Sequence, residues 1–204
     1  TMTGNFVKQP VIKQLKYSEF LTEIIIATTT NSEDDVIEEF AKSNNIKLFR
    51  GSSNDVLDRY YQCAKKFHFD TIIRITADCP LVDPSIINSV LKKFKENDFD
   101  YISTTIEYRN GRWVDSSCNF PPGLAVEIAK FSALEQAWME AKKPSEIEHV
   151  FPYVQFNPDK FKLDNFVNST DFSNILFFSQ NSTNLFSFSV MLEPAIDFSI
   201  LEGI

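Results

Sequence analysis

Two carboxylates lie in the segment RITADCPLVDP (74–84), where an apolar run ends. The run TIIRIT (71–76) predicts a buried strand, and Asp78 follows it closely, ahead of a proline. A carboxylate at the end of a strand suits a hard cation such as Mg²⁺, which prefers oxygen ligands. Asp78 and Arg74 are therefore the candidate catalytic residues. Asp78 could instead cap a turn or pair with Arg74, so a catalytic and a structural interpretation both stay open.

A second candidate group lies in FRGSSNDVLDRY (49–60). Gly51 permits a tight turn from a strand into a helix, and the residues after it offer free hydrogen-bond donors at the helix start. Arg50 and Arg59 could meet an anionic ligand or its base. The same pattern also fits a well-capped turn with two surface arginines.

The third group combines PPGLAVE (121–127) with EIEHVFPY (146–153). It contains Glu127, Glu148 and His149, which is one of only two histidines in the chain. These residue types can do acid–base or binding chemistry. A single histidine in such a segment can equally be structural.

Strands and helices alternate over the first two-thirds of the chain and would position these groups. Apolar and β-branched runs predict strands, and amphipathic spacing between them predicts helices. This order is typical of an α/β fold of the doubly wound, Rossmann-like type, with a mostly parallel sheet and helices on both faces. Ligands bind at the carboxyl ends of strands in such folds, so we expect Thr28, Thr29, Arg50, Gly51 and Asp78 along one edge. The predicted strands are 22–29, 46–49, 71–76 and 100–105, and the helices are 31–43, 54–67 and 83–96.

The pattern changes after about residue 106. We expect a loop or short hairpin first, then a strand, a helix that opens with a capping box from Ser132 to Glu135, and a short helix or turn. An alternating strand and a final helix close the chain. We interpret residues 1–204 as one domain with a substrate or dimerisation lobe at about 106–170. The later ranges are a strand at 124–131, a helix at 132–143, a helix or turn at 145–156, a strand at 185–192 and a helix at 193–204.

Composition excludes some functions. The formal charge is −8 over 204 residues, whereas nucleic-acid surfaces need clustered Lys and Arg. The three cysteines have no metal-ligand spacing and indicate reduced thiols. No apolar segment has the length of a membrane span. We therefore expect a cytoplasmic protein that binds neither nucleic acid nor membrane.

Together these segments resemble a known family. Residues 49–91, with R-G-S-x-x-D-V-L-x-R-Y and R-x-T-x-D-C-P-L-x-D, and residues 121–163 are similar to cytidylyltransferases of the spore-coat-polysaccharide type. That family is related to the acylneuraminate and 3-deoxy-manno-octulosonate cytidylyltransferases. The resemblance covers residues 10 to 165 well and the remainder loosely.

The resemblance implies transfer of CMP from CTP to a sugar acid, giving a CMP-sugar and pyrophosphate for polysaccharide or glycoconjugate synthesis. It implies Mg²⁺ held by Asp78 and by a second carboxylate near the chain end. It places Arg50, Asp55 and Arg59 near the cytosine and ribose. It places Glu127, Glu148 and His149 in a lobe that faces the sugar and, in a homodimer, a partner subunit.

Two departures from the family pattern bear on activity. TMTGNFVKQPVIKQL (1–15) stands where the family has a first strand and a basic loop that cradles the triphosphate, and only QPVIKQL matches the helix after that loop. A sheet without its central first strand leaves ladder groups unpaired unless another segment fills the slot. SVMLEPAIDF (189–198) stands where the family shows T-V-D-x-P-E-D-F. Glu193 or Asp197 would then be the second metal ligand.

These departures motivate two alternatives. One is a degenerate, non-catalytic relative that binds a partner or an active subunit through the lobe. The other is a nucleotidyltransferase that uses another nucleotide.

Overall fold

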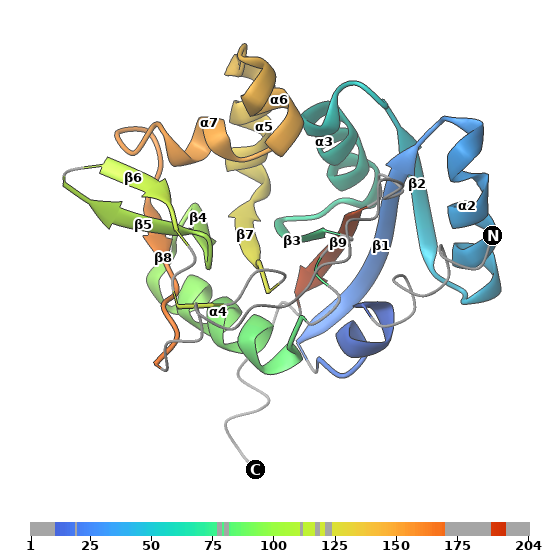
Figure 1. Ribbon diagram of the computed structural model, residues 1–204, viewed down its shortest axis with the longest axis horizontal. Coiled ribbons are helices and arrows are strands. Elements are labelled where there is room, and N and C mark those ends of the chain that lie inside the picture. Colours follow the sequence, from blue (N-terminus) through green and yellow to red (C-terminus); the bar gives the residue numbers. More distant parts are fainter. Residues whose placement is uncertain are drawn as a thin grey trace.

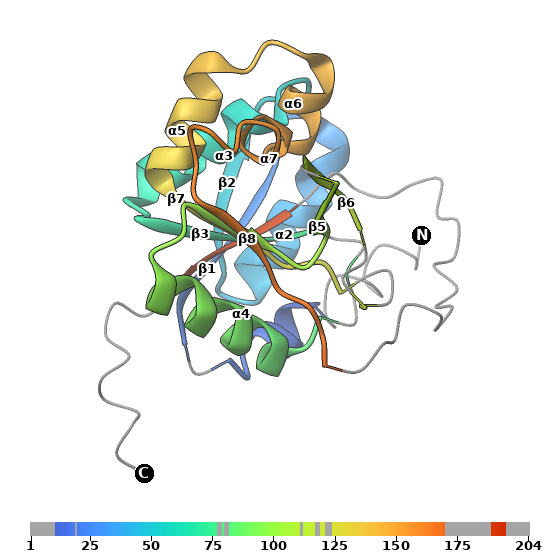
Figure 2. The same ribbon diagram turned by 90° about the vertical axis from the view of Figure 1, so that its left-hand side faces the viewer.

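The computed structural model describes residues 11–18, 20–76, 79, 82–110, 112–116, 119–120, 124–169 and 189–194. Over these residues the chain forms a seven-stranded sheet and a separate two-stranded sheet, with helices packed around the larger one (Figures 1 and 2). The strands are β1 (Leu21–Thr29), β2 (Lys47–Gly51), β3 (Thr71–Thr76), β4 (Tyr101–Ser103), β5 (Ile106–Arg109), β6 (Arg112–Asp115), β7 (Glu127–Lys130), β8 (Leu163–Asn165) and β9 (Ser189–Pro194). The helices are η1 (Ser32–Asp34), α2 (Asp35–Ser43), α3 (Val56–Phe67), α4 (Pro84–Asn97), α5 (Phe131–Glu140), α6 (Pro144–His149) and α7 (Pro152–Gln155).

The large sheet is mixed, with the strand order β2-β1-β9-β3-β7-β4-β8. Only β1–β2 and β4–β8 are parallel neighbours, because β9 and β7 run against the strands on either side of them. The α/β class is confirmed, but the expected mostly parallel pairing is corrected to a mixed sheet. The physical reason is that β9 and β7 are inserted between strands that themselves share one direction.

Strand β9 fills the central slot that the sequence led us to question. Its backbone pairs with β1 on one side and with β3 on the other, with Met191 opposite both Ile25 and Arg74. Val190 and Met191 are fully buried. The ladders of β1 and β3 are therefore satisfied by a segment from near the end of the chain rather than by a strand from its beginning.

The sheet separates two hydrophobic clusters. One lies under α2, α4 and a helical segment at 11–15, and includes Ile37, Phe94 and Leu15. The other lies under α3, α5, α6 and α7, and includes Tyr60 and Phe151. Figure 2 shows the two layers of helices on opposite sides of the sheet.

Most local predictions match the observed elements. Asp83 caps α4 with Pro84 at its first position, and Leu57, Tyr60 and Ala64 form the buried face of α3, as expected. The predicted loop or hairpin after residue 106 is the hairpin β5–β6. Strand β8 was not expected. The capping box at Ser132 is wrong, because α5 begins at Phe131 after Lys130 and has no side-chain cap.

Part of the predicted lobe belongs to the main sheet. Strands β7 and β8 lie within 106–170 and pair with β4. The hairpin and helices α5 to α7 extend from them (Figure 1). Within the described residues, no helix is long and apolar enough to cross a membrane. The predicted final helix lies outside the described residues.

Candidate nucleotide and substrate site

The carboxyl ends of β1, β2 and β3 meet at one edge of the sheet. Thr28 and Thr29 lie opposite Arg50 and Gly51, and Ala27 and Thr76 both lie opposite the first residue of β9. The register thus brings the predicted strand-end residues together, as expected for this kind of sheet. Asp78 itself lies outside the described residues.

Thr28 and Thr29 are held by a buried acid, Asp34. One of its oxygens, Oδ2, accepts hydrogen bonds from Thr28 Oγ1 at 2.8 Å, Thr29 Oγ1 at 2.5 Å and the Thr29 backbone N–H at 3.1 Å. Asp34 is 4% exposed and ends the 3-10 turn η1. This carboxylate fixes the loop that follows β1.

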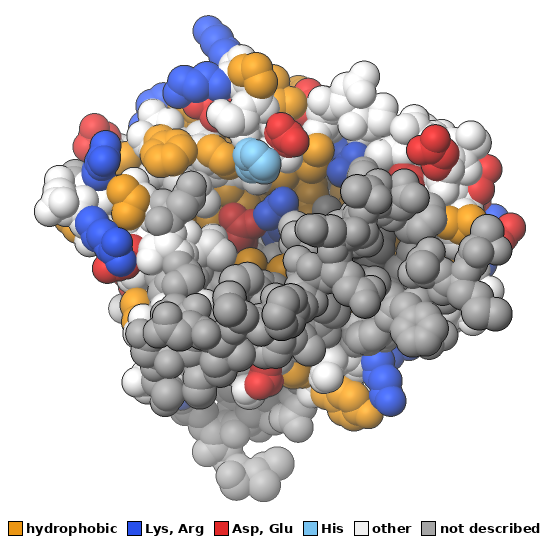
Figure 3. All heavy atoms as spheres, in the orientation of Figure 1, with side chains coloured by type: hydrophobic (Ala, Val, Ile, Leu, Met, Phe, Trp, Pro, Cys, Tyr) orange, Lys and Arg blue, Asp and Glu red, His pale blue; other side chains and the backbone are white. Residues whose placement is uncertain are grey.

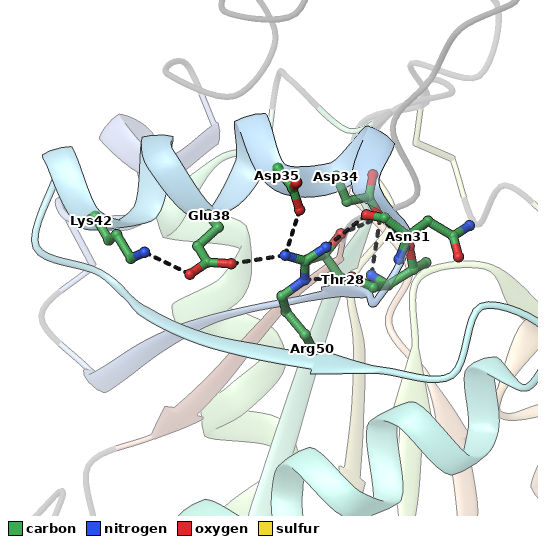
Figure 4. A network of polar contacts seen from close by, with 8 residues as sticks. Thr28, Asn31, Asp34, Asp35, Glu38, Lys42 and Arg50 are labelled. Carbon is green, nitrogen blue, oxygen red and sulfur yellow. Dashed lines mark hydrogen bonds and ion pairs between the residues drawn. The ribbon is translucent and has the colours of Figure 1, made fainter.

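Arg50 is bound within the protein on several sides (Figure 4). Its Nη1 donates to Asp35 Oδ1 at 2.7 Å and to Glu38 Oε2 at 2.8 Å. Its Nε donates to the Thr29 carbonyl at 2.8 Å and its Nη2 to the Asn31 carbonyl at 2.7 Å. These bonds raise the pKa of Arg50 and tie β2 to the loop and helix after β1. In this arrangement the donors of Arg50 are used internally.

Gly51 and Asp55 shape the turn into α3. A Cβ at Gly51 would lie 2.7 Å from Phe49 Cε1 and 3.0 Å from Arg59 Cγ, so the absent side chain makes room for both neighbours. Asp55 is the N-cap of α3 and accepts a hydrogen bond from the Asp58 N–H at 2.7 Å. The structure thus gives Asp55 a capping role at the site edge.

Arg59 is a buried cation on α3 that forms no ion pair with the described residues. It is 2% exposed, and its Nη1 donates to the Ser52 carbonyl at 2.7 Å. Within the described part of the chain its Nε has no hydrogen-bond partner, and no ion pair of this residue is found there. Burial lowers the pKa of Arg59 and the charge of Arg74 acts in the same direction, whereas Asp34 and Asp55 act to raise it.

Arg74 and Glu127 form an ion pair across β3 and β7. The residues lie directly opposite each other, and Arg74 Nη1 donates to Glu127 Oε2. Burial acts to lower the pKa of Arg74, but Glu127 outweighs it and the pKa is raised. The Arg74 guanidinium also lies over the Tyr60 ring, 5.7 Å from its centroid. Its Nε has no hydrogen-bond partner among the described residues.

The same carboxylate continues the network toward the lobe. Tyr101 donates its hydroxyl hydrogen to Glu127 Oε1 at 2.8 Å, and Gln155 Nε2 donates to the Tyr101 hydroxyl oxygen at 2.7 Å. Burial raises the pKa of Tyr101, and Glu127 raises it further, so the phenol stays protonated as a donor. The network links β3, β7, β4 and α7.

Glu148 and His149 lie at the end of α6, and both are exposed. They differ in this from Glu127, the third predicted residue of the group, which is buried. Val150 follows with φ 74° and ψ −57°, and the Phe151 N–H bonds to the His149 carbonyl at 3.0 Å. This is a γ-turn that a β-branched residue rarely adopts. The strain is held by full burial of Val150 and Phe151. The turn between α6 and α7 therefore sets His149 at the surface.

The described residues do not form a metal centre. None of their His, Cys, Asp and Glu side chains make a group of three suited to an ion. Asp78 and Asp197 lie outside the described residues. The backbone of Glu193 pairs with Glu23 at the far end of β1, four residues beyond the point where β9 meets Thr76. That offset is about 13 Å along a strand, so β9 does not bring Glu193 to the edge that precedes Asp78.

Figure 3 shows the surface in the orientation of Figure 1. Basic and acidic side chains meet in a hollow near the centre of the view, with a histidine at its rim and hydrophobic side chains around it. A mixed polar floor within an apolar rim is typical of small-molecule sites.

Sequence reasoning missed three residues of the site, Asp34, Tyr101 and Gln155. Asp34 lies among the first-turn acids of a predicted helix and carried no separate signal. Tyr101 begins a predicted strand, and its hydroxyl bond depends on the neighbouring strand. The hydrogen bonds of Asp34, Tyr101 and Gln155 join segments that are separate in the sequence, so only the folded structure reveals them.

The amino-acid sequence is similar to a known protein family and to two curated proteins. A family model described as cytidylyltransferase matches residues 3–190. The uncharacterized protein MJ1063 of Methanocaldococcus jannaschii is 40% identical over 153 residues, which are 75% of this chain and 58% of that protein. The spore coat polysaccharide biosynthesis protein SpsF of Bacillus subtilis is 26% identical over 149 residues, 72% of this chain and 56% of that protein. The chain thus spans less than two-thirds of the length of these relatives.

Solved structures give a consistent result. A cytidylyltransferase from Leptospira borgpetersenii serovar Hardjo-bovis superposes with a TM-score of 0.73 at 33% identity, covering 82% of this chain and 67% of that one. A CMP:2-keto-3-deoxy-manno-octonic acid synthetase complexed with CTP gives a TM-score of 0.57 at 13% identity, covering 79% and 78%. The second likeness shows a shared fold.

Proposed function

Since the chain belongs to the cytidylyltransferase family, a family of nucleotidyltransferases, we propose that it transfers CMP from CTP to a sugar acid. The products are a CMP-sugar and pyrophosphate. The observation that carries the proposal is the family match over residues 3–190, joined to a sheet edge where Thr28 and Thr29 lie opposite Arg50 and Gly51. The relationship to SpsF supports a role in polysaccharide or glycoconjugate synthesis.

Each site residue has a proposed task. The loop after β1 and the turn after β2 face the nucleotide, and Asp34, Arg50 and Asp55 hold these segments rigid. Glu148 and His149 lie on the lobe that we propose faces the sugar. A rigid edge orients the acceptor hydroxyl toward the α-phosphate, which lowers the entropic part of the barrier.

We propose Mg²⁺ as the ion, with Asp78 and Asp197 as its carboxylate ligands. A bound Mg²⁺ would neutralise phosphate charge during transfer. Glu193 fits this role poorly, because its backbone lies toward the opposite end of β9.

The lobe also supports a proposed homodimer. Trp138, Met139 and Phe156 are large apolar side chains on α5 and just after α7, and all three are exposed. Such side chains are enriched at interfaces between subunits. We propose a cytoplasmic location on the expectation of reduced cysteines, of which Cys63 and Cys79 are buried.

A second candidate function has an observation of its own. Strand β9 occupies the slot between β1 and β3 where the resemblance implies a first strand that leads into a phosphate loop. This arrangement favours a non-catalytic relative that binds a partner through the lobe.

Pyrophosphate release separates these candidates. We would incubate the chain with CTP, Mg²⁺ and a panel of sugar acids that includes nonulosonates and 3-deoxy-octulosonate. ATP, GTP and UTP serve as matched nucleotides, and sugar 1-phosphates as matched acceptors. Release that requires both CTP and one sugar acid is the expected result. No release with any pair, together with no CTP binding by calorimetry, would refute the enzyme and favour the binding module.

A further inference from the structure

The turn between α6 and α7 contains a valine in a strained backbone conformation. Val150 has φ 74° and ψ −57°, and the Phe151 N–H donates to the His149 carbonyl at 3.0 Å, which closes a γ-turn. The other described non-glycine residues with positive φ are all Asn, Asp or His, with φ between 51° and 67°. Those residue types adopt positive φ at modest cost, whereas a β-branched residue does so only when its surroundings force it. At Val150 the backbone therefore conflicts with the local preference of the residue.

Packing within the lobe holds this turn in its conformation. Val150 and Phe151 are both fully buried in the cluster under α3, α5, α6 and α7. The centroids of the Phe151 and Tyr101 rings lie 5.2 Å apart, and the Phe151 carbonyl accepts from the Gln155 N–H of α7 at 2.9 Å. Burial of the two apolar side chains offsets the cost of the strained backbone. The surrounding core, rather than the local sequence, thus selects the conformation of the turn.

The other end of α6 is fixed by a buried carboxylate. Glu146 is 5% exposed, and its Oε2 accepts from the N–H groups of the two residues that precede α6, each at 3.1 Å. Glu148 and His149 lie between this cap and the turn at Val150, and both side chains are exposed. Helix α6 also contacts α3 and α7 (Figure 1). Two exposed polar residues therefore lie on a short helix that is fixed at both ends.

The turn is also joined to the polar network of the sheet. Tyr101, against which Phe151 packs, donates to Glu127 at 2.8 Å and accepts from Gln155 at 2.7 Å. Glu127 in turn forms the ion pair between β7 and β3. A movement of the turn would displace Phe151 and with it the packing of Tyr101. A fixed turn therefore keeps the end of α6 in a constant position relative to this network.

We propose that Val150 is a positioning residue, whose strained turn holds Glu148 and His149 in one place and thereby orients the acceptor sugar for transfer. This inference rests on the proposed function, in which these two exposed side chains face the sugar. Strained backbone conformations cluster at sites where a fixed geometry serves binding or catalysis. Val150 itself is buried and acts only through its neighbours.

A pair of substitutions at Val150 separates the strain of the turn from the burial of the side chain. Alanine removes two methyl groups and still resists positive φ, whereas glycine adopts it freely. We expect Val150→Gly to unfold at a higher temperature than Val150→Ala, although glycine is the smaller residue and ordinarily the more destabilising one.

Val154 is the matched control for this comparison. It is fully buried in the same cluster, but it lies within α7. At this position the order should be the ordinary one, with Val154→Ala unfolding at a higher temperature than Val154→Gly. If alanine were the more stable substitution at both positions, Val150 would carry no strain and the proposal would be overturned.

The kinetic parameters should follow the same order. Val150→Ala should lower kcat/KM for the sugar acid roughly 10- to 100-fold, because a misplacement of about 1 Å can cost a factor of about 100, and should leave the KM for CTP unchanged. Val150→Gly should show a smaller loss, since glycine accepts the turn. Val154→Ala removes the same two methyl groups from the same cluster and should leave both parameters at their wild-type values. Equal losses in Val150→Ala and Val154→Ala would assign the effect to core packing and overturn the positioning role.

Amide hydrogen exchange of the ligand-free protein makes the test independent of turnover. The Phe151 amide closes the γ-turn, so its exchange relative to that of the β4 amides should accelerate at least roughly 10-fold in Val150→Ala and less in Val150→Gly. An unchanged relative rate in Val150→Ala would show that Val150 does not hold the turn.

The two measurements distinguish the positioning role from the proposed function. If the wild type releases no pyrophosphate with any acceptor, the proposed function fails, while faster exchange at Phe151 in Val150→Ala still supports Val150 as the residue that fixes the end of α6. Release that requires a sugar acid, with kcat/KM unchanged in Val150→Ala, would leave the function standing and overturn the positioning role.

Discussion

Replacing Glu127 by glutamine should destabilise the protein strongly, because this carboxylate balances a buried arginine. Glu127 is 6% exposed and accepts hydrogen bonds from both Arg74 and Tyr101. The amide keeps one acceptor oxygen but removes the negative charge that pairs with Arg74. Breaking one side of a buried ion pair costs about 3–5 kcal/mol. Because the glutamine amide oxygen still accepts a hydrogen bond, we expect the free energy of unfolding to fall by about 3 kcal/mol, the lower end of this range.

Urea unfolding followed by circular dichroism would measure this loss. For a domain of this size ~3 kcal/mol corresponds to a drop of roughly 6–12 °C in the unfolding temperature. Glu135→Gln is the matched control, because Glu135 accepts from the Tyr61 hydroxyl at 3.1 Å on the partly exposed surface of α5. That variant should lose less than about 1 kcal/mol.

A double variant tests the charge argument itself. Adding Arg59→Met to Glu127→Gln removes the buried positive charge that repels Arg74, so part of the lost stability should be recovered. Coupled residues in one network typically interact by about 0.5–3 kcal/mol. Equal losses in Glu127→Gln and Glu135→Gln, with no recovery in the double variant, would refute the reasoning.

Three further predictions concern other parts of the chain. Asp78→Asn should abolish Mg²⁺-dependent pyrophosphate release without changing the circular dichroism spectrum, and retained release would remove Asp78 from the metal site. Gly51→Ala should lower stability by about 1–3 kcal/mol in urea unfolding, because the new Cβ would lie 2.7 Å from a Phe49 ring carbon. Burial raises the pKa of the Cys63 thiol to about 12, so the unfolded chain ionises first and stability should fall as the pH rises from about 9 to 12. Cys63→Ala should flatten that decline, and an identical pH profile would contradict the burial effect.

The sequence predicted the local elements well because their signals are local. The β-branched run at β1 and the spacing on α3 each depend on residues a few positions apart. Asp83 with Pro84 marks a helix start in the same way. Strand β8 has only three residues, all partly exposed, and its pattern is too short to read.

Strand neighbours could not be predicted in the same way. The alternation in residues 185–192 indicates a strand, but alternation is the same for a parallel and an antiparallel partner. The insertion of β9 between β1 and β3, and of β7 between β3 and β4, depends on contacts across the whole chain. The mixed character of the sheet therefore appears only in the tertiary structure.

The sequence predicted which residues lie together at the edge of the sheet, but not the contacts that each of them makes. The predicted strand ends placed Thr28, Thr29, Arg50 and Gly51 side by side. The pairing of β1 with β2 confirms this placement. The sequence could not show that α2 supplies carboxylates to Arg50, since Asp35 and Glu38 look like ordinary helix acids. It also could not show that Glu127 faces Arg74 across two strands.

The polar residues around the site fall into two groups. In one group the hydrogen-bonding atoms have partners within the protein, and in the other some of them have no partner among the described residues. Arg50 bonds to two carboxylates and two carbonyls, and the Thr29 hydroxyl bonds to Asp34, so their contacts explain why these residue types stand there. Arg59 differs, because its burial is costly and its described contacts do not offset that cost. Local structure and internal stability usually agree in a folded protein, and positions where they conflict tend to serve a ligand. Arg59 is such a position: among the described residues its side chain donates only to the Ser52 carbonyl, although the charges of Asp34 and Asp55 favour its charged form.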